Sequence, residues 1–378
     1  MIKGSSTMSV KELNKRAMTA FLYTHGPATK QMLERELGLS LPTITQNLRI
    51  LEDEGLVHKA EQLDSTGGRK AQTFAFTPTH RAAIGVTMRS SGLTMCAVDL
   101  SGEVIARRVR LISYRNTDSY YQQMGTIINS FAQSVAKNCG QVLGVAFSIQ
   151  GIVDASGTTI TFGKIMQNTG LSLDEIAQNV DYPCIMIHDS DAAAMAELWF
   201  DHSLSDAVCV YLDRRPGGAV IVSGALYQGP NLCNGTIEHM TLIPGGKLCY
   251  CGQHGCMDVY CSPETLAEDG ESLSGFFSVL EQGEQEHRRR FNEWLGNVAQ
   301  AICNIRGLLA GDIIIGGEAA HFLDEHDIAH LRELVEERSA FHTDHFALRK
   351  SLCLDDQNEI GAALRFVQSY IDEVCSAI

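Results

Sequence analysis

The stretch Cys249-Tyr250-Cys251-Gly252-Gln253-His254-Gly255-Cys256, with His239 nine intervening residues upstream, is the most specific pattern in this 378-residue chain and decides its fold. It supplies three thiols and an imidazole, a complete ligand set for tetrahedral zinc. Glycines within it let the backbone turn tightly enough for the sulfurs to converge. We predict a structural Zn²⁺ site whose four ligands, His239, Cys249, Cys251 and Cys256, leave no position open. The alternative is that these are reduced thiols buried like small hydrophobic side chains.

The remaining cysteines, of 12 in all, are scattered through the chain, so we expect reduced thiols rather than disulfides. Cys233 and Cys261 lie close to the cluster in the sequence and could join the metal shell. The sequence leaves that point open.

Composition indicates a folded protein, because 44% of the residues are hydrophobic and only 8 are prolines. No apolar run is long enough to cross a bilayer, and the polar residues 1–15 lack the apolar centre of a signal peptide. We therefore expect a cytoplasmic protein without a membrane partner.

Charge is distributed unevenly along the chain. Residues 1–78 hold ten Lys or Arg against eight Asp or Glu, whereas the remainder holds 20 against 37. The larger part would repel a polyanion. Binding to DNA would therefore depend on local placement of basic groups in the first 78 residues.

The first 54 residues predict three helices. An apolar-periodic stretch at 13–23 ends at His25-Gly26-Pro27, and Thr29 can cap a second helix that closes at Gly38. Ser40 can cap a third helix from Leu41 to about Glu54. The tight junction between the second and third helices is typical of a helix-turn-helix.

The third helix has the pattern of a recognition helix. Ile44, Leu48 and Leu51 form one apolar stripe, and short polar side chains project elsewhere. Such side chains suit base edges and phosphates in a major groove. The predicted DNA-binding residues of this region are Thr29, Ser40, Pro42, Thr43, Thr45, Gln46, Asn47 and Arg49. The alternative is a solvated polar face on a helical bundle.

Two strands, at 55–60 and 71–76, flank a polar loop that contains Gly68, Arg69 and Lys70. Glycine permits close approach to DNA, and the two cations could grip phosphates or enter a minor groove. We predict a wing, although an ordinary surface loop would have a similar sequence. Together these segments indicate a winged helix-turn-helix.

Beyond residue 78 strands alternate with helices, which indicates a two-lobed α/β body. Expected strands cover 84–88, 94–99, 104–111, 142–148, 184–188, 207–212, 219–222 and 312–317. Expected helices cover 120–137, 192–200, 291–309 and about 359–374.

Over nearly its full length the chain resembles the ROK family of sugar kinases and sugar-linked transcriptional repressors. The features that carry the resemblance are the winged head, the Gly151-Ile152-Val153-Asp154 turn, the His188-Asp189 pair, residues 235–239, the cysteine cluster and Gly316-Gly317. The family implies an actin-like (ribonuclease H-like) body that holds a sugar in its cleft. We expect a DNA-binding domain at 1–80, a first lobe at 81–190 completed by a C-terminal helix at 359–378, and a second lobe at 191–358 that carries the zinc loop.

The chain departs from the kinase members of the family at both phosphate turns. Gly85-Val86-Thr87-Met88-Arg89-Ser90-Ser91-Gly92 lacks the acid and the paired glycines of the first turn. Asp213-Arg214-Arg215-Pro216 occupies the start of the second, where only Gly217 and Gly218 remain. Close approach of backbone to phosphate needs glycine. We therefore expect no kinase activity.

The sugar site implied by the family is only partly preserved. Asp189 matches the catalytic aspartate of the kinases, but His188 replaces the usual asparagine. The Glu-x-Gly-His motif of the family becomes Thr236-Ile237-Glu238-His239, and a glutamate after the last cysteine becomes Asp258. The expected ligand-binding residues are His188, Asp189, Thr236, His239 and Asp258.

We predict a regulator, in sign a repressor by family resemblance, of carbohydrate uptake or catabolism genes, controlled by a sugar or sugar phosphate. A single recognition helix reads few base pairs, so a homodimer or homotetramer on an operator is expected. Two alternatives stay open: a sugar kinase with an appended head, and a regulator whose cleft binds no sugar and that answers to a partner protein.

Overall fold

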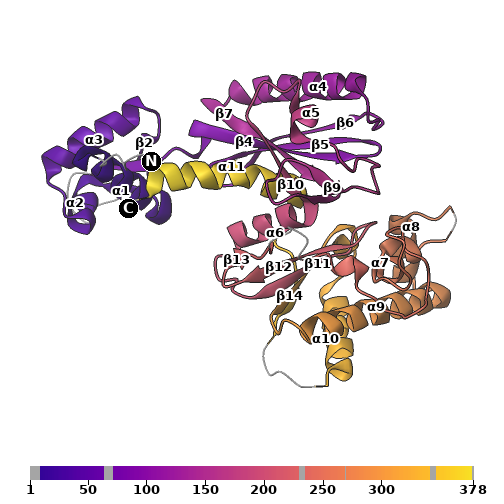
Figure 1. Ribbon diagram of the computed structural model, residues 1–378. Helices are drawn as coiled ribbons and strands as arrows, with labels where there is room; N and C mark the ends of the chain where they lie inside the picture. Colours follow the sequence, from indigo (N-terminus) through magenta and orange to yellow (C-terminus); the bar gives the residue numbers. More distant parts are fainter. Residues whose placement is uncertain (1–8, 64–70, 230–234, 269, 341–345, 377–378) are drawn as a thin grey trace, which may run out of the picture.

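The computed structural model describes residues 9–63, 71–229, 235–268, 270–340 and 346–376. Figure 1 shows a small head at one end, followed by two larger lobes that meet around α6. Within these residues no helix is both long and apolar enough to span a bilayer.

The head combines three helices with a small sheet. They are α1 (Val10–His25), α2 (Lys30–Leu37) and α3 (Leu41–Asp53), and the sheet has the order β1 (Ala28–Thr29), β3 (Ala71–Phe76), β2 (Val57–Leu63). The three predicted helices and both wing strands are confirmed. The short β1 strand was not expected, because two residues carry no periodicity.

Local chemistry sets the limits of these helices. The side chain of Ser40 accepts a hydrogen bond from the Thr43 N–H and so caps α3. Gly38 ends α2 in the left-handed conformation, at φ 64°, and its N–H donates to the Glu34 carbonyl. A turn of three residues therefore joins the two helices of the helix-turn-helix.

The first lobe is built on a mixed five-stranded sheet with the order β10-β7-β4-β5-β6. Its strands are β4 (Arg81–Arg89), β5 (Gly92–Asp99), β6 (Val104–Leu111), β7 (Gln141–Ile149) and β10 (Cys184–His188). β4 pairs in parallel with β7, and β7 with β10, whereas β4, β5 and β6 form an antiparallel meander. The lobe also contains α4 (Asp118–Ala136), α5 (Leu173–Ala177) and a hairpin of β8 (Ile152–Val153) and β9 (Ile160–Phe162).

The second lobe has its own five-stranded sheet, with the order β13-β12-β11-β14-β15. Its strands are β11 (Ala207–Tyr211), β12 (Gly217–Val222), β13 (Ala225–Leu226), β14 (Asp312–Gly316) and β15 (Leu348–Lys350). The helices around it are α6 (Asp189–Phe200), α7 (Asp258–Cys261), α8 (Leu273–Glu281), α9 (Gln285–Arg306) and α10 (Glu325–Arg338). A single apolar core joins α8, α9 and α10 to one face of the sheet.

The last helix, α11 (Gln357–Cys375), packs on both the first sheet and α6 and reaches α1 of the head (Figure 1). Gly361 makes the close approach to α6 possible, because a Cβ there would lie 1.6 Å from the Ala192 carbonyl oxygen. Farther along, Leu364, Val367 and Ile371 belong to the same apolar cluster as the core of the head.

Nearly every predicted element of the body is present, so the two-lobed α/β prediction is confirmed. The limits of the predicted strands and helices differ by a few residues from the observed ones, and by six at the start of α9. The domain boundaries at 80, 190 and 358 stay a prediction.

A buried carboxylate links α6 to the strand β15. Glu197 is 1% exposed and pairs with Arg349. It also accepts hydrogen bonds from the Ser351 hydroxyl (2.6 Å) and the Leu352 N–H (3.0 Å). Asp201 binds the other guanidinium nitrogen of Arg349 at 2.7 Å.

We predict that Glu197→Ala lowers the free energy of unfolding by about 2–3 kcal/mol, because it leaves buried donors unpaired while Arg349 keeps Asp201. Urea denaturation followed by tryptophan fluorescence measures this change. The matched control is Glu293→Ala, which removes an exposed pair with Arg289 and should cost less than about 1 kcal/mol. Equal effects of the two substitutions would contradict the assignment.

Candidate ligand cleft and metal cluster

The four predicted metal ligands lie together. One donor atom from each of His239, Cys249, Cys251 and Cys256 falls within 4.8 Å of the other three. Cys249 and Cys256 are buried, at 2% and 0% exposure. The Sγ atoms of Cys251 and Cys256 are 3.7 Å apart, and His239 directs Nδ1 to Cys249 Sγ at the same distance. The cluster could therefore hold a metal ion.

Tight backbone turns produce this convergence. The Cys249 N–H donates to the Gln253 carbonyl at 2.8 Å, and the Gly252 N–H donates to the Cys249 carbonyl at 2.9 Å. Gly255 adopts φ 81°, and a Cβ at this position would lie 1.8 Å from the Ile243 carbonyl oxygen. Only glycine fits there, as the sequence suggested.

The donor chemistry fits zinc. Burial raises the pKa of the Cys249 thiol to about 12 and also raises the pKa of Cys256. Burial lowers the pKa of His239, which favours the neutral imidazole that binds metals. A bound dication would oppose the cost of ionising the thiols.

The two additional cysteines are now distinguished. Cys261 is fully buried but is not part of the cluster, and its carbonyl accepts a hydrogen bond from the Trp294 indole N–H at 2.9 Å. Cys233 lies outside the described residues.

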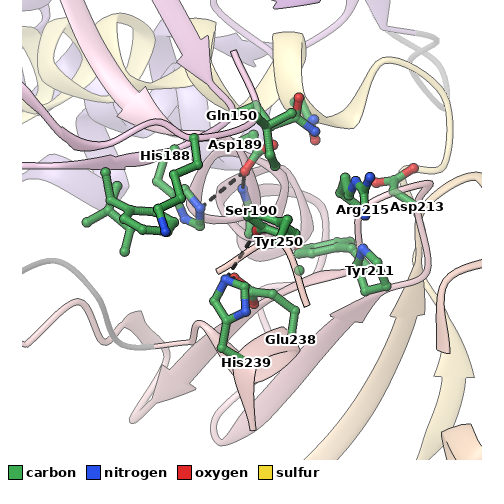
Figure 2. Close-up of a pocket in the computed structure, with 18 residues that line it drawn as sticks. Gln150, His188, Asp189, Ser190, Tyr211, Asp213, Arg215, Glu238, His239 and Tyr250 are labelled. Carbon is green, nitrogen blue, oxygen red and sulfur yellow. Dashed lines mark hydrogen bonds and ion pairs between the residues drawn. The ribbon is translucent and has the colours of Figure 1, made fainter. Parts of the chain in front are cut away.

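A cavity between the two lobes adjoins the cluster (Figure 2). The first lobe lines it with residues of the β7–β8 turn, β9 and the end of β10. The second lobe lines it with the starts of α6 and β12, the β11–β12 turn, and the cluster. Its charged and potentially charged lining residues are Lys164, His188, Asp189, Asp213, Arg215, Glu238 and His239.

His188 and Asp189 lie where β10 passes into α6. His188 Nε2 is 3.3 Å from Asp189 Oδ1, and the same oxygen accepts a hydrogen bond from the Ser190 N–H at 2.8 Å. The Asp189 side chain is 22% exposed. It can therefore still accept hydrogen bonds from a ligand, and its role as a ligand contact stays a prediction.

Glu238 is a cavity residue that the sequence pattern did not single out. It is 7% exposed and lies beside His239 in the short helix η2 (Ile237–His239). Burial raises the pKa of its carboxyl group to about 7. The sequence did hold one signal for a role of Glu238 in the cavity. Glu238 stands where the family motif has glycine, two residues after Thr236, which stands where the motif has glutamate.

Tyr250 lies between the upper and lower walls of the cavity (Figure 2). Its hydroxyl is 3.1 Å from His239 Nε2, so the two imidazole nitrogens face different partners. The guanidinium of Arg215 lies 5.3 Å from the centre of the Tyr250 ring. Tyr250 thus connects the metal cluster to the cavity.

Two predicted ligand contacts are corrected by the structure. Thr236 does not line this cavity but a separate apolar groove, bordered by β11, β12 and the end of α9. Asp258 is fully buried behind the cavity, where it faces Arg215 Nη1 at 3.4 Å and Cys249 Sγ at 3.7 Å. Its side chain is shorter than the glutamate of the family and is held by these neighbours.

The two turns that depart from the kinase pattern are occupied by side chains. β4 and β5 join through Ser90-Ser91, with Arg89 paired to Gly92 in the ladder. In the second turn, Arg215 projects into the cavity towards Asp258. Burial raises the pKa of Asp213 to about 6. Neither turn presents a run of glycine N–H groups for a phosphate.

The DNA-binding prediction is refined on α3. Pro42, Thr45, Gln46 and Arg49 are exposed, and Thr43 is half-buried. Asn47 was expected among the projecting polar residues, but it is 3% exposed and its amide donates to the Thr43 carbonyl at 2.9 Å. It lies one turn after Ile44 and beside Leu48, so the spacing of the helix turns it into the core.

Two other predicted DNA-binding positions lie at helix starts. Ser40 is exposed and caps α3. Thr29 is 7% exposed and accepts a hydrogen bond from the Met32 N–H as the cap of α2. Gly68, Arg69 and Lys70 lie outside the described residues.

Comparison with known proteins identifies the family from the body of the chain. Residues 83–368, which include both lobes, the cleft and the cysteine cluster, match the ROK family. The chain belongs to the ROK family. Its relatives include the DNA-binding transcriptional dual regulator NagC of Escherichia coli (strain K12), to which it is 27% identical over 280 residues, or 73% of this chain and 67% of NagC. The Xylose repressor of Bacillus subtilis (strain 168) is 22% identical over 260 residues, 68% of this chain and 67% of the repressor.

Solved structures confirm the predicted ROK fold. A ROK family transcriptional regulator described as a homolog of the E. coli MLC protein matches with a TM-score of 0.76 at 22% identity, over 97% of this chain and 98% of the regulator. A ROK family glucokinase from Streptomyces griseus, in complex with glucose and AMPPNP, matches with a TM-score of 0.65 at 20% identity over 75% of this chain and 98% of the glucokinase. The regulator match includes the head, whereas regulators and kinases share the body.

Proposed function

We propose that this ROK protein is a cytoplasmic, DNA-binding transcriptional regulator of genes for carbohydrate uptake or catabolism, and that it represses these genes. The observation that carries the proposal is a helix-turn-helix with an exposed polar face on α3, joined through α11 to a body with a polar cleft. The name of the Xylose repressor supports the link to sugars. A sugar or sugar phosphate in the cleft is the proposed effector.

The exposed side chains at the start of α3 suit a major groove. Thr45 and Gln46 can bind base edges, and Arg49, one turn later, can bind a phosphate or a guanine. Arg69 and Lys70 of the wing loop add positive charge. Because a single helix reads few base pairs, a homodimer or homotetramer on a palindromic operator completes the proposal.

Arg49→Ala, and separately the double variant Arg69→Ala/Lys70→Ala, should weaken operator binding and reduce the salt slope by about one unit for every phosphate that is no longer neutralised. The measurement is the dissociation constant for an operator fragment, selected from genomic DNA with the wild-type protein, between about 50 and 200 mM salt. Arg289→Ala, on the exposed surface of α9, is the matched control. An unchanged slope in the double variant would reject the wing assignment.

We propose that the metal is a structural Zn²⁺ bound by His239, Cys249, Cys251 and Cys256. When bound, the ion supplies a cross-link between η2 and the loop at 249–256. Because His239 also reaches Tyr250 in the cleft, the ion would fix the imidazole that faces the ligand. This connection could couple cleft occupancy to the position of the heads.

Cys249→Ser should reduce bound zinc from one ion per chain to well below that and should lower the melting temperature, since a structural ion contributes to folding. Metal content by mass spectrometry and thermal unfolding measure the two effects. Cys303→Ser, outside the cluster, should keep its zinc. A Cys249→Ser protein that keeps full DNA affinity without metal would rule out the coupling.

The proposal includes the absence of kinase activity, because the first phosphate turn lacks its paired glycines and the second keeps only Gly217 and Gly218. A sugar kinase with an appended head is the first alternative, since the glucokinase body has the same fold. A regulator with a cleft that binds no sugar and answers to a partner protein is the second.

A thermal-shift screen of the zinc-loaded protein against sugars, sugar phosphates and ATP separates these functions, because a ligand that binds the folded state raises its melting temperature. We expect a sugar to raise it and ATP neither to raise it nor to be hydrolysed. ATP turnover with any sugar would favour the kinase. No shift with any compound would favour the partner-controlled regulator.

A further inference from the structure

Glu238 places a carboxyl group with one unpaired oxygen at the wall of the cleft. The residue is 7% exposed, and its Oε2 has no hydrogen-bond partner within the described part of the chain. The other oxygen, Oε1, is 3.7 Å from His239 Nε2, beyond hydrogen-bonding distance. A buried acceptor without a donor is costly, so this group is prepared for a ligand that brings one.

The cationic side chains of the cavity are directed to other partners. Lys164 Nζ donates to the Cys251 carbonyl at 3.0 Å and lies over the Phe162 ring. Arg215 faces Asp258 and lies over the Tyr250 ring. Among the residues that the structure describes, no lysine or arginine forms an ion pair with Glu238.

Further negative charge lies around this carboxylate. Asp189 and Asp213 line the same cavity, and three thiolates on a dication would carry one net negative charge. A phosphate group at Glu238 would add repulsion, whereas a positively charged group would reduce it. The charges of the cleft therefore favour a cationic group on the ligand.

An ammonium group has the chemistry that Glu238 lacks. It carries the opposite charge and offers three N–H donors, whereas a hydroxyl group offers one neutral donor. A hydrogen bond to an ionised partner is about twice as strong as one between neutral groups. An N-acetyl group would remove the charge and add bulk at a buried position.

We propose that Glu238 is a specificity-determining residue and that the cleft selects an amino sugar, whose ammonium group binds the Glu238 carboxylate while its hydroxyl groups donate to Asp189. This inference rests on the proposed function, in which the cleft holds a sugar. It goes beyond the family pattern, where a glycine occupies the position of Glu238. The family's acid is missing at Thr236, and Glu238 supplies an acid at a different position, where it would select a different ligand.

The test is isothermal titration calorimetry of the full, zinc-loaded chain with D-glucosamine, D-mannosamine and D-galactosamine. Each amino sugar is compared with its neutral parent sugar and its N-acetyl derivative, so that the members of a set differ only at the nitrogen-bearing carbon. We expect at least one amino sugar to bind about tenfold or more tightly than both of its counterparts.

Glu238→Gln keeps the shape of the side chain and removes its charge. It should reduce the preference for the amino sugar to less than about threefold, because the affinity for the amino sugar falls more than the affinity for the neutral parent. Glu264→Gln, an exposed acid of the same lobe outside the cavity, is the matched control and should keep the preference. Glu238→Asp, which keeps the charge, provides a second variant if the Glu238→Gln protein does not fold.

Equal wild-type affinity for the amino and neutral sugars would overturn the proposal and leave the sugar-responsive regulator standing. An unchanged preference in folded Glu238→Gln would also overturn it. If none of these sugars binds, the amino-sugar proposal fails, and the thermal-shift screen decides whether another sugar or a sugar phosphate is the effector. The operator-binding experiment then tests the regulator independently.

Discussion

The close packing of α11 against α6 is the constraint on which the arrangement of this molecule depends. Gly361 brings the two helices together at the Ala192 carbonyl, where a single additional carbon atom would clash. From that point α11 runs along the first sheet and ends in the apolar cluster of the head. The start of α6 carries Asp189, and its far end carries Glu197, which anchors β15 of the second lobe. One helix pair therefore fixes the cleft, both lobes and the attachment of the DNA-binding head.

For the proposed regulator, this arrangement offers a physical route between the ligand in the cleft and DNA. A ligand that binds between His188-Asp189 and Glu238 contacts both lobes, so it has different interactions in an open and in a closed cleft. Closing the cleft would move the second lobe relative to α6 and hence relative to α11. Because the head shares its core with α11, a small rotation at the lobes would change the separation of the two heads in the proposed dimer. Half-site spacing on DNA is sensitive to such a change.

The cleft also shows how members of one family can share a fold and differ in the chemistry of their side chains. Arg215 stands in a turn that presents glycines in kinases, and here its guanidinium covers Tyr250 and faces Asp258. The hydroxyl of Tyr250 in turn lies within hydrogen-bonding distance of His239 Nε2. Arg215 and Tyr250 thus line the cavity beside Asp189 and Glu238. The body retains the fold because its sheets and helices depend on apolar cores that these polar substitutions do not touch.

The sequence by itself determined the local elements and the grouping of His239 with the three cysteines. These features depend on interactions between residues that are close in the sequence, so they can be predicted from it. They are the helix caps such as Ser40, the alternation of strands and helices, and the cysteine spacing. Tertiary structure decided the two-residue strand β1, which forms only because β3 lies beside it, and the burial of Asn47 against the rest of the head. It also removed Thr236 and Asp258 from the cleft wall and placed Glu238 there. The direction of a side chain at a lobe interface depends on elements distant in the sequence, so spacing within one motif could not determine it.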